Sequence, residues 1–154
     1  MKARVIEPWL REPLDRFLRE TGARLALLMT PSGQVLAQYG FIRAVDVMAA
    51  AALGAGIAAS TGEMARMIDE RSFRALNHQS PRHGIFLAQF ASPRGPLLAL
   101  VVYGPDSSIG LVQLFFEQLV GDVAEAAPAA PPSAPVLPAD FERDLNESLA
   151  TLFR

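Results

Sequence analysis

The sequence predicts an α+β sandwich over residues 12–125, with the element order α-β-β-α-β-β-β-α. Residues 85–88 and 97–102 are apolar at consecutive positions, which is typical of strands in a sheet covered on both faces. Residues 45–69 form a long predicted helix, and its uncharged stretch 47–62 is apolar on almost every side. A surface helix of a small monomer keeps a polar face. This helix therefore needs both a sheet and a second surface to pack against.

The first helix and the first hairpin have clear boundary signals. Pro13 suits the first position of a helix, and Gly22 suits a left-handed cap after its last turn. Residues 24–29 and 34–39 are predicted strands. The turn 30–33 between them has Pro at its second position and Gly at its last, as β-turns prefer.

The second half of the domain contains three predicted strands and a helix. The strands cover residues 71–79, 84–90 and 96–103, and Pro- or Gly-containing turns separate them. Either Asp106 or Ser107 is expected to cap the following helix.

Two interpretations of helix 45–69 differ in what covers its sides. In the simpler one the helix is only a core layer over the sheet, and Val45, Met48, Leu53 and Met64 belong to that layer in either case. In the second, which we favour, one side is also a dimer interface, because one sheet face cannot bury every side of a helix. The strand 71–79 is expected at the sheet edge, where pairing across a two-fold axis satisfies its backbone groups. The predicted interface residues are Ala49, Ala52, Gly56, Ala59, Ser60, Phe73 and Leu76.

Residues 126–139 predict a linker, since they hold five of the twelve prolines of the chain. The expected organisation is a domain over 1–125, the linker 126–139 and a short amphipathic helix over 140–154. This helix either folds back on its own domain or docks on a partner, and the sequence allows both. Its apolar side holds Phe141, Leu145, Leu149, Leu152 and Phe153.

Composition excludes several classes of function. The chain is 51% hydrophobic and 19% charged, with a formal charge of −2 and one lysine, Lys2, so no basic patch for nucleic acid is expected. No cysteine is present, which excludes disulfides, Cys-zinc sites and thiol catalysis. Residues 1–9 lack the apolar core of a signal peptide, and 47–62 is shorter than the roughly 20 residues of a membrane span. We therefore expect a cytoplasmic protein without a membrane span.

No pattern of residues indicates catalysis. His78 and His83 flank a turn without metal-ligand partners, and neither a nucleophile elbow nor a phosphate-binding loop is present. We expect no enzyme activity, no metal and no cofactor.

Three stretches resemble the roadblock/dynein light-chain family: "LRETGARLALLMTPSGQVLA" at 18–37, "AASTGEMARMI" at 58–68 and "LLALVVYGPDSSIGLVQLFFEQL" at 97–119. The resemblance covers about 110 of the 154 residues. It implies an antiparallel five-stranded sheet with the second helix on one face and the first and third helices on the other. It also implies a homodimer or heterodimer formed through the second helix and the third strand.

The Pro-rich linker and terminal helix resemble those of bacterial family members that regulate a small Ras-like GTPase. The resemblance implies a homodimeric, GTPase-activating-type partner that repositions the GTPase's own residues and supplies no arginine finger. It implies that the terminal helix contacts the GTPase at a second place. The alternative is a scaffold subunit that binds a GTPase or another complex without changing turnover. A ligand-sensing sandwich is a third possibility, although no convergent polar groups mark a pocket.

Overall fold

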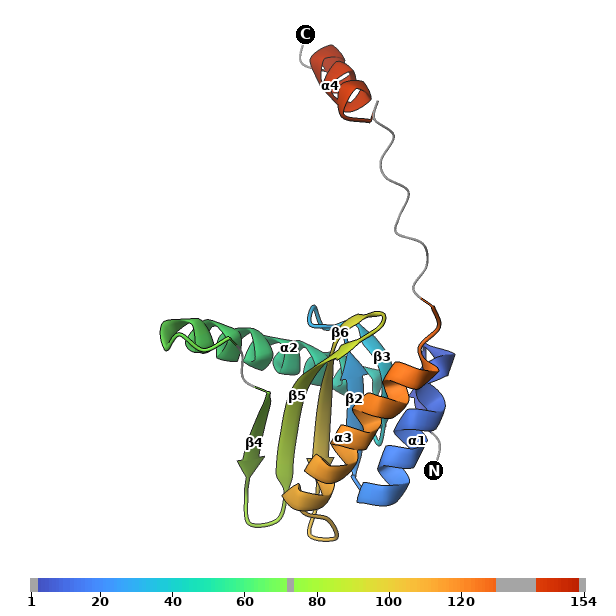
Figure 1. Ribbon diagram of the computed structural model, residues 1–154, viewed down its shortest axis with the longest axis vertical. Helices are drawn as coiled ribbons and strands as arrows, with labels where there is room; N and C mark the ends of the chain where they lie inside the picture. Colours follow the sequence, from blue (N-terminus) through green and yellow to red (C-terminus); the bar gives the residue numbers. More distant parts are fainter. Residues whose placement is uncertain (1–2, 72–73, 130–140, 153–154) are drawn as a thin grey trace.

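The computed structural model describes residues 3–71, 74–129 and 141–152. Within them, six strands form one antiparallel sheet that lies between two layers of helices (Figure 1). The strands are β1 (Arg4–Val5), β2 (Leu25–Met29), β3 (Val35–Tyr39), β4 (Ala75–Gln79), β5 (Gly84–Ser92) and β6 (Gly95–Tyr103). The helices are a 3-10 turn η1 (Pro8–Leu10), α1 (Arg11–Thr21), α2 (Ala44–Met67), α3 (Ile109–Ala126) and α4 (Phe141–Leu152).

The sheet has the order β1-β3-β2-β6-β5-β4, which adds one strand to the five expected. In β1, Arg4 pairs with Gln38 and Val5 with Ala37 of β3. Two residues are too few to show the period-2 alternation that marks a strand, so β1 has no signal in the sequence. Strand β4 lies at the opposite edge, as expected for residues 71–79, although the strand itself begins at Ala75.

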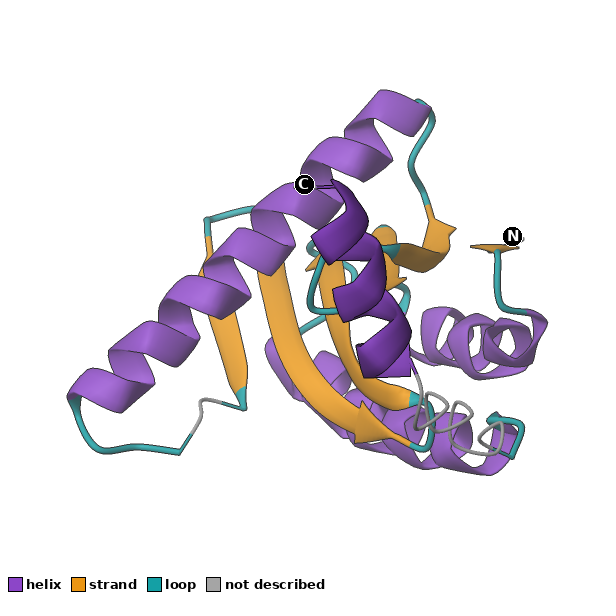
Figure 2. Cartoon of the chain, turned by 90° about the horizontal axis from the view of Figure 1, so that it is seen from above, coloured by secondary structure: helices purple, strands orange, loops and turns teal. Residues whose placement is uncertain are grey.

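Alternation along the strands divides the core between the two faces of the sheet. Figure 2 shows the helices that lie against these strands. Leu28 and Ala99 contribute to the larger cluster, which α1 and α3 cover, while Leu27 and Leu98 belong to the smaller cluster under α2. On the α1/α3 side, the ring of Phe116 meets two aromatic rings of β5 edge-on, with centroid distances of 5.2 and 5.6 Å. The prediction that helices cover both faces is therefore confirmed.

The helix boundaries follow local hydrogen bonds. Gly22 has φ 66° and its N–H donates to Leu18 O at 2.9 Å, which confirms the predicted left-handed cap of α1. Helix α3 is capped by Ser108, whose Oγ accepts from Leu111 N at 3.2 Å. The expectation of Asp106 or Ser107 was wrong by one or two residues, because three adjacent residues of capping type leave the exact position open.

Helix α2 is longer than its uncharged stretch suggested. Its 24 residues make it, among the described residues, the single helix long and apolar enough to cross a membrane by length and composition. The helix agrees closely with the predicted range 45–69, and the residues at its ends beyond 47–62 include Asp46, Glu63 and Arg66. Here the helix lies on the sheet, with Val47, Ala51 and Ala65 buried.

The glycine at the end of β3 has a testable steric role. Gly40 has φ 89°, and a Cβ added there would lie 2.2 Å from the backbone oxygen of Arg24. Gly22 also has a positive φ, but a Cβ there would meet nothing within 4 Å. We expect Gly22→Ala to lower the free energy of unfolding by about 1–2 kcal/mol through backbone strain alone. Gly40→Ala should lower it by more than about 3 kcal/mol, because the β2–β3 backbone must shift. Urea unfolding of both variants measures the difference, and equal losses would contradict this steric assignment.

Candidate functional site

The inner side of α2 is built from small residues. Val47, Ala51, Gly54 and Ala65 are buried against the sheet. A Cβ on Gly54 would lie 2.8 Å from Cε of Met29, so a larger residue there would require this methionine side chain to shift. Glycines inside a helix predict that another backbone approaches closely, but the atoms nearest to this position belong to side chains of the sheet. Gly56 has open space around it.

The large apolar residues of α2 lie outside this contact. Val45 is 53% exposed, Met48 71%, Leu53 68% and Met64 59%, so the prediction that they form the core layer was wrong. A helix that is apolar all round carries no polar face to show which side turns to solvent. The small residues face the sheet because they allow the closest contact, and the larger ones are left outside.

The outer side of α2 carries the helix residues predicted for the interface. Ala49, Ala52, Gly56, Ala59 and Ser60 are all exposed. Ser60 Oγ donates to Gly56 O at 2.8 Å, so its hydroxyl is already satisfied within the helix. The larger members of this surface were not among the predicted interface residues, although their helical spacing was a usable signal. Together the residues form what we call the α2 outer face: Ala49, Ala52, Leu53, Gly56, Ile57, Ala59, Ser60 and Met64.

Strand β4 lies next to the α2 outer face at the sheet edge. Within the described residues it pairs with β5 alone, so its other side offers free backbone N–H and C=O groups. Leu76, one of the predicted interface residues, is half-buried and pairs with Leu87. Phe73, the other predicted residue of this strand, lies outside the described residues.

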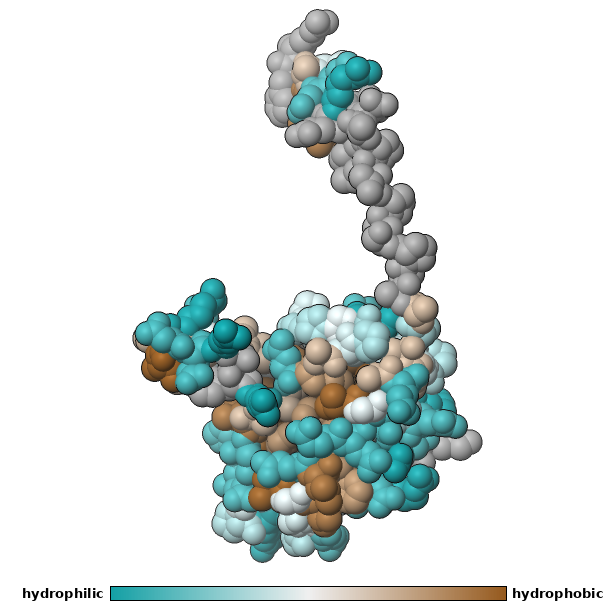
Figure 3. Space-filling view, viewed as in Figure 1, coloured by the Kyte–Doolittle hydropathy of each residue, from teal (hydrophilic) through white to brown (hydrophobic). Residues whose placement is uncertain are grey.

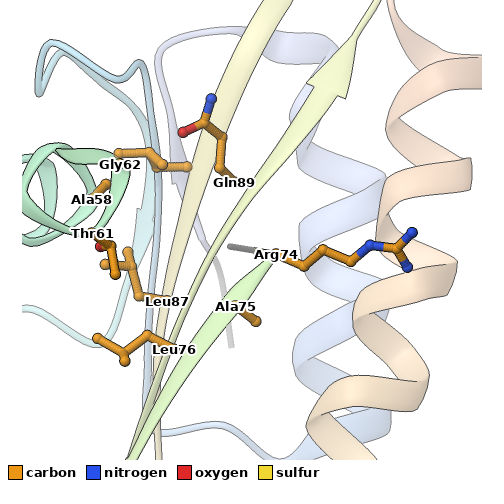
Figure 4. A pocket seen from close by; sticks show the side chains of 9 residues that line it. Ala58, Thr61, Gly62, Arg74, Ala75, Leu76, Leu87 and Gln89 are labelled. Carbon is orange, nitrogen blue, oxygen red and sulfur yellow. The ribbon is translucent and has the colours of Figure 1, made fainter. Parts of the chain in front are cut away.

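A small hollow separates the second half of α2 from the edge of the sheet. Its volume is about 60 Å³, and Thr61, Gly62, Leu76 and Leu87 are among the residues that line it (Figure 4). In the close-up, Leu76 and Leu87 point toward α2, whereas the side chain of Arg74 extends away from it. Helix α2 then projects past β4, and apolar residues lie at its projecting end (Figures 1 and 3). Met67 and Ile68 there are exposed.

The histidines and acidic residues show no built site in the described ranges. His83 Nε2 lies 3.2 Å from Arg24 Nη1, and His78 is an exposed residue of β4. No group of three or more His, Asp or Glu side chains in the described part of the chain is placed to hold a metal ion.

Helix α4 lies apart from the sandwich (Figure 1). Of the predicted docking residues, Leu145, Leu149 and Leu152 belong to the helix and are exposed. The backbone of Phe141 begins the helix, but its side chain and the whole of Phe153 lie outside the described residues.

Comparison with known proteins identifies the fold. The gliding protein MglB of Thermus thermophilus is 30% identical, with a TM-score of 0.67, over 78% of this chain and 89% of that one. MglB of Myxococcus xanthus is 22% identical, with a TM-score of 0.67, over 75% of this chain and 92% of that one. A roadblock/LC7 domain of Streptomyces avermitilis is 16% identical, with a TM-score of 0.61, over 72% and 91%.

The sequence comparisons give a family but no curated relative. No curated protein matches the chain. The model of the Roadblock/LC7 domain matches residues 10–101, which include α1, both strands of the first hairpin, α2 and most of the remaining sheet. The chain therefore belongs to the Roadblock/LC7 family, as its sequence pattern had predicted.

Proposed function

We propose that this chain is a homodimeric regulator of a small Ras-like GTPase of the MglA type, acting in the cytoplasm. The observation that carries the proposal is the largely apolar α2 outer face and the free edge of β4, in a fold shared with MglB at 30% identity.

The dimer would remove two unfavourable exposures at once. Removing apolar surface from water is favourable by roughly 25 cal/mol of free energy per Å². The α2 outer face exposes apolar side chains as large as Leu53, Ile57 and Met64. Pairing of β4 with its two-fold mate would satisfy the free backbone groups of the edge. A contiguous apolar patch of this kind marks an interaction site in a soluble protein.

Regulation would work by positioning. GTP hydrolysis on small GTPases is governed by positioning and electrostatics around groups of the GTPase itself. The proposal requires that no arginine of the described domain acts as a catalytic finger. Arg66 forms an ion pair with Glu63 on α2, Arg74 extends away from that helix, and Arg71 and Arg82 are exposed.

Charge on the α2 outer face should break the dimer. Gly56→Arg and Ala59→Arg put a guanidinium where the proposed interface excludes water, and both positions have room for it in the single chain. We expect light scattering to show dimers for the wild type and monomers or aggregates for these variants. Gly121→Arg is the matched control, because this glycine of α3 also has open space around it. A monomeric wild type at micromolar concentration would refute the dimer.

Single arginine substitutions should leave stimulation of hydrolysis largely intact. We expect Arg66→Ala, Arg71→Ala, Arg74→Ala and Arg82→Ala each to fall far short of the drop of about 10³-fold or more that follows loss of an arginine finger. Single-turnover hydrolysis by the GTPase, with binding measured in parallel, tests this. A variant that binds normally but no longer stimulates would show that the mechanism is wrong. Binding by the wild type without any stimulation would favour the scaffold alternative.

Removal of residues 128–154 should leave the folded domain unchanged. The truncation keeps Ala127, whose N–H donates to Val123 O at 3.0 Å and closes the last turn of α3. We expect the thermal midpoint and the dimer to be nearly unaffected, while affinity for the GTPase or nucleotide exchange changes. The division into a domain (1–125), a linker (126–139) and a docking helix (140–154) remains a prediction, and a truncated chain that failed to fold would contradict it.

A further inference from the structure

We propose that α4 docks on its own domain, in a groove at the sheet edge opposite β4. This inference does not depend on the GTPase. It concerns where the terminal helix rests before any partner is present.

The groove lies where the N-terminal segment and β3 meet the start of α2. Its volume is about 320 Å³, within the range of roughly 300–1,000 Å³ that ligand pockets occupy. Eight of its eleven lining residues are apolar. Ile42 is 93% exposed beside it, and Ile6 and Met48 are also exposed, so the groove presents apolar side chains to solvent. We call this feature the N-terminal groove.

The charged residues that line the N-terminal groove are both basic. They are Arg4 of β1 and Arg43, which precedes α2. Arg43 Nε lies 3.7 Å from Asp46 Oδ2, but both side chains are largely exposed, so this pair is weak and solvent-screened. The rim is therefore complementary to an acidic, amphipathic segment.

Helix α4 has this chemistry. Leu145, Leu149 and Leu152 recur at i, i+4 and i+7, and all three are exposed. Residues 140–154 contain four acidic and two basic side chains, which gives a net charge of −2. Glu142 precedes Leu145 by three residues, so helical spacing puts both positions on one side, whereas Glu147 falls on the opposite side. With the leucines in the groove, helical spacing would put position 142 on the side of α4 that faces the domain.

The connecting chain is long enough for this contact. Residues 127–140 separate α3 from α4, and fourteen residues span at most about 50 Å when fully extended. A domain of this size has a radius of gyration of about 14 Å, so α4 reaches any part of its own surface. A short linker also keeps the effective concentration of the helix near the millimolar range. Weak docking is then enough to keep the helix in place for much of the time.

The docked state would compete with binding of α4 elsewhere. The leucines that enter the N-terminal groove are the same ones that a partner would bury. Strand β4 lies at the other end of the sheet order from β1, so docking in the N-terminal groove leaves this strand edge free. Helix α4 would then lie in the N-terminal groove when no partner is bound and outside it when a partner binds its leucines.

Disulfide trapping tests the proposal in the full-length chain, which contains no natural cysteine. Ala44→Cys places a thiol in the groove lining, and Ser148→Cys places one beside the leucines of α4. The control pair joins Ser148→Cys to Arg82→Cys in the exposed turn before β5. With oxidised glutathione we expect the groove pair to form an intrachain disulfide at least about tenfold faster than the control pair.

Charge reversal supplies the matched controls. Glu142→Arg should bring the trapping rate of the groove pair close to that of the control pair, and Glu147→Arg should leave it nearly unchanged. Adding Arg43→Glu to Glu142→Arg should restore it. Equal rates for the two cysteine pairs would show that α4 has no site here. A covalent dimer in place of the intrachain product would assign the helix to a second copy and overturn docking within one chain. Neither result would bear on GTPase regulation.

Discussion

Helix α2 covers one face of the sheet alone, whereas α1 and α3 share the other. A helix with its side chains is about 10–12 Å wide. Helix α2 runs across the strands (Figure 1), so its width covers only part of the length of β5 and β6, which at nine residues each span roughly 30 Å. The N-terminal groove lies at the start of α2 near β3, and the hollow lies at its second half near β4. Both candidate interaction surfaces are therefore found where a single helix meets an edge of the sheet.

The same constraint explains why small residues face inward on α2. With a single helix over this face, close contact to the sheet matters more than the volume of each side chain. Gly54 and Ala51 let the helix approach Met29 and its neighbours. Leucine, isoleucine and methionine remain on the outside, where they gain nothing unless another surface covers them. This is the reverse of an ordinary amphipathic helix, and a second packing partner would remove this apolar surface from water.

Sequence reasoning reached most of the fold because the strands carry strong signals. Consecutive apolar residues in β5 and β6 indicated a sheet covered on both faces, and Gly22 and Gly33 marked the turns around β2. It missed β1, which is too short to show a period. It also assigned the wrong residues of α2 to the core, because a helix without a polar face does not show which of its sides packs against the sheet. Predicting the N-terminal groove requires knowing which residues β1 and α2 bring together. Those contacts arise only in the tertiary structure and leave no local pattern in the sequence.

The two surfaces differ in what they are suited to bind. The α2 outer face is largely apolar, with the exposed Glu63 beside Ala59 and Ser60, and β4 offers a free strand edge. An occupant of both would gain apolar burial and backbone hydrogen bonds. This combination favours a permanent partner with the same surface. The N-terminal groove is small and has an arginine rim, so salt weakens the electrostatic part of any contact there. An occupant that gains two or three leucine contacts and loses helix and linker entropy binds weakly and leaves readily. The edge at β4 is thus suited to assembly, and the edge at β1 is suited to a reversible contact. Helix α2 runs from one of these edges to the other, so both surfaces include part of the same helix.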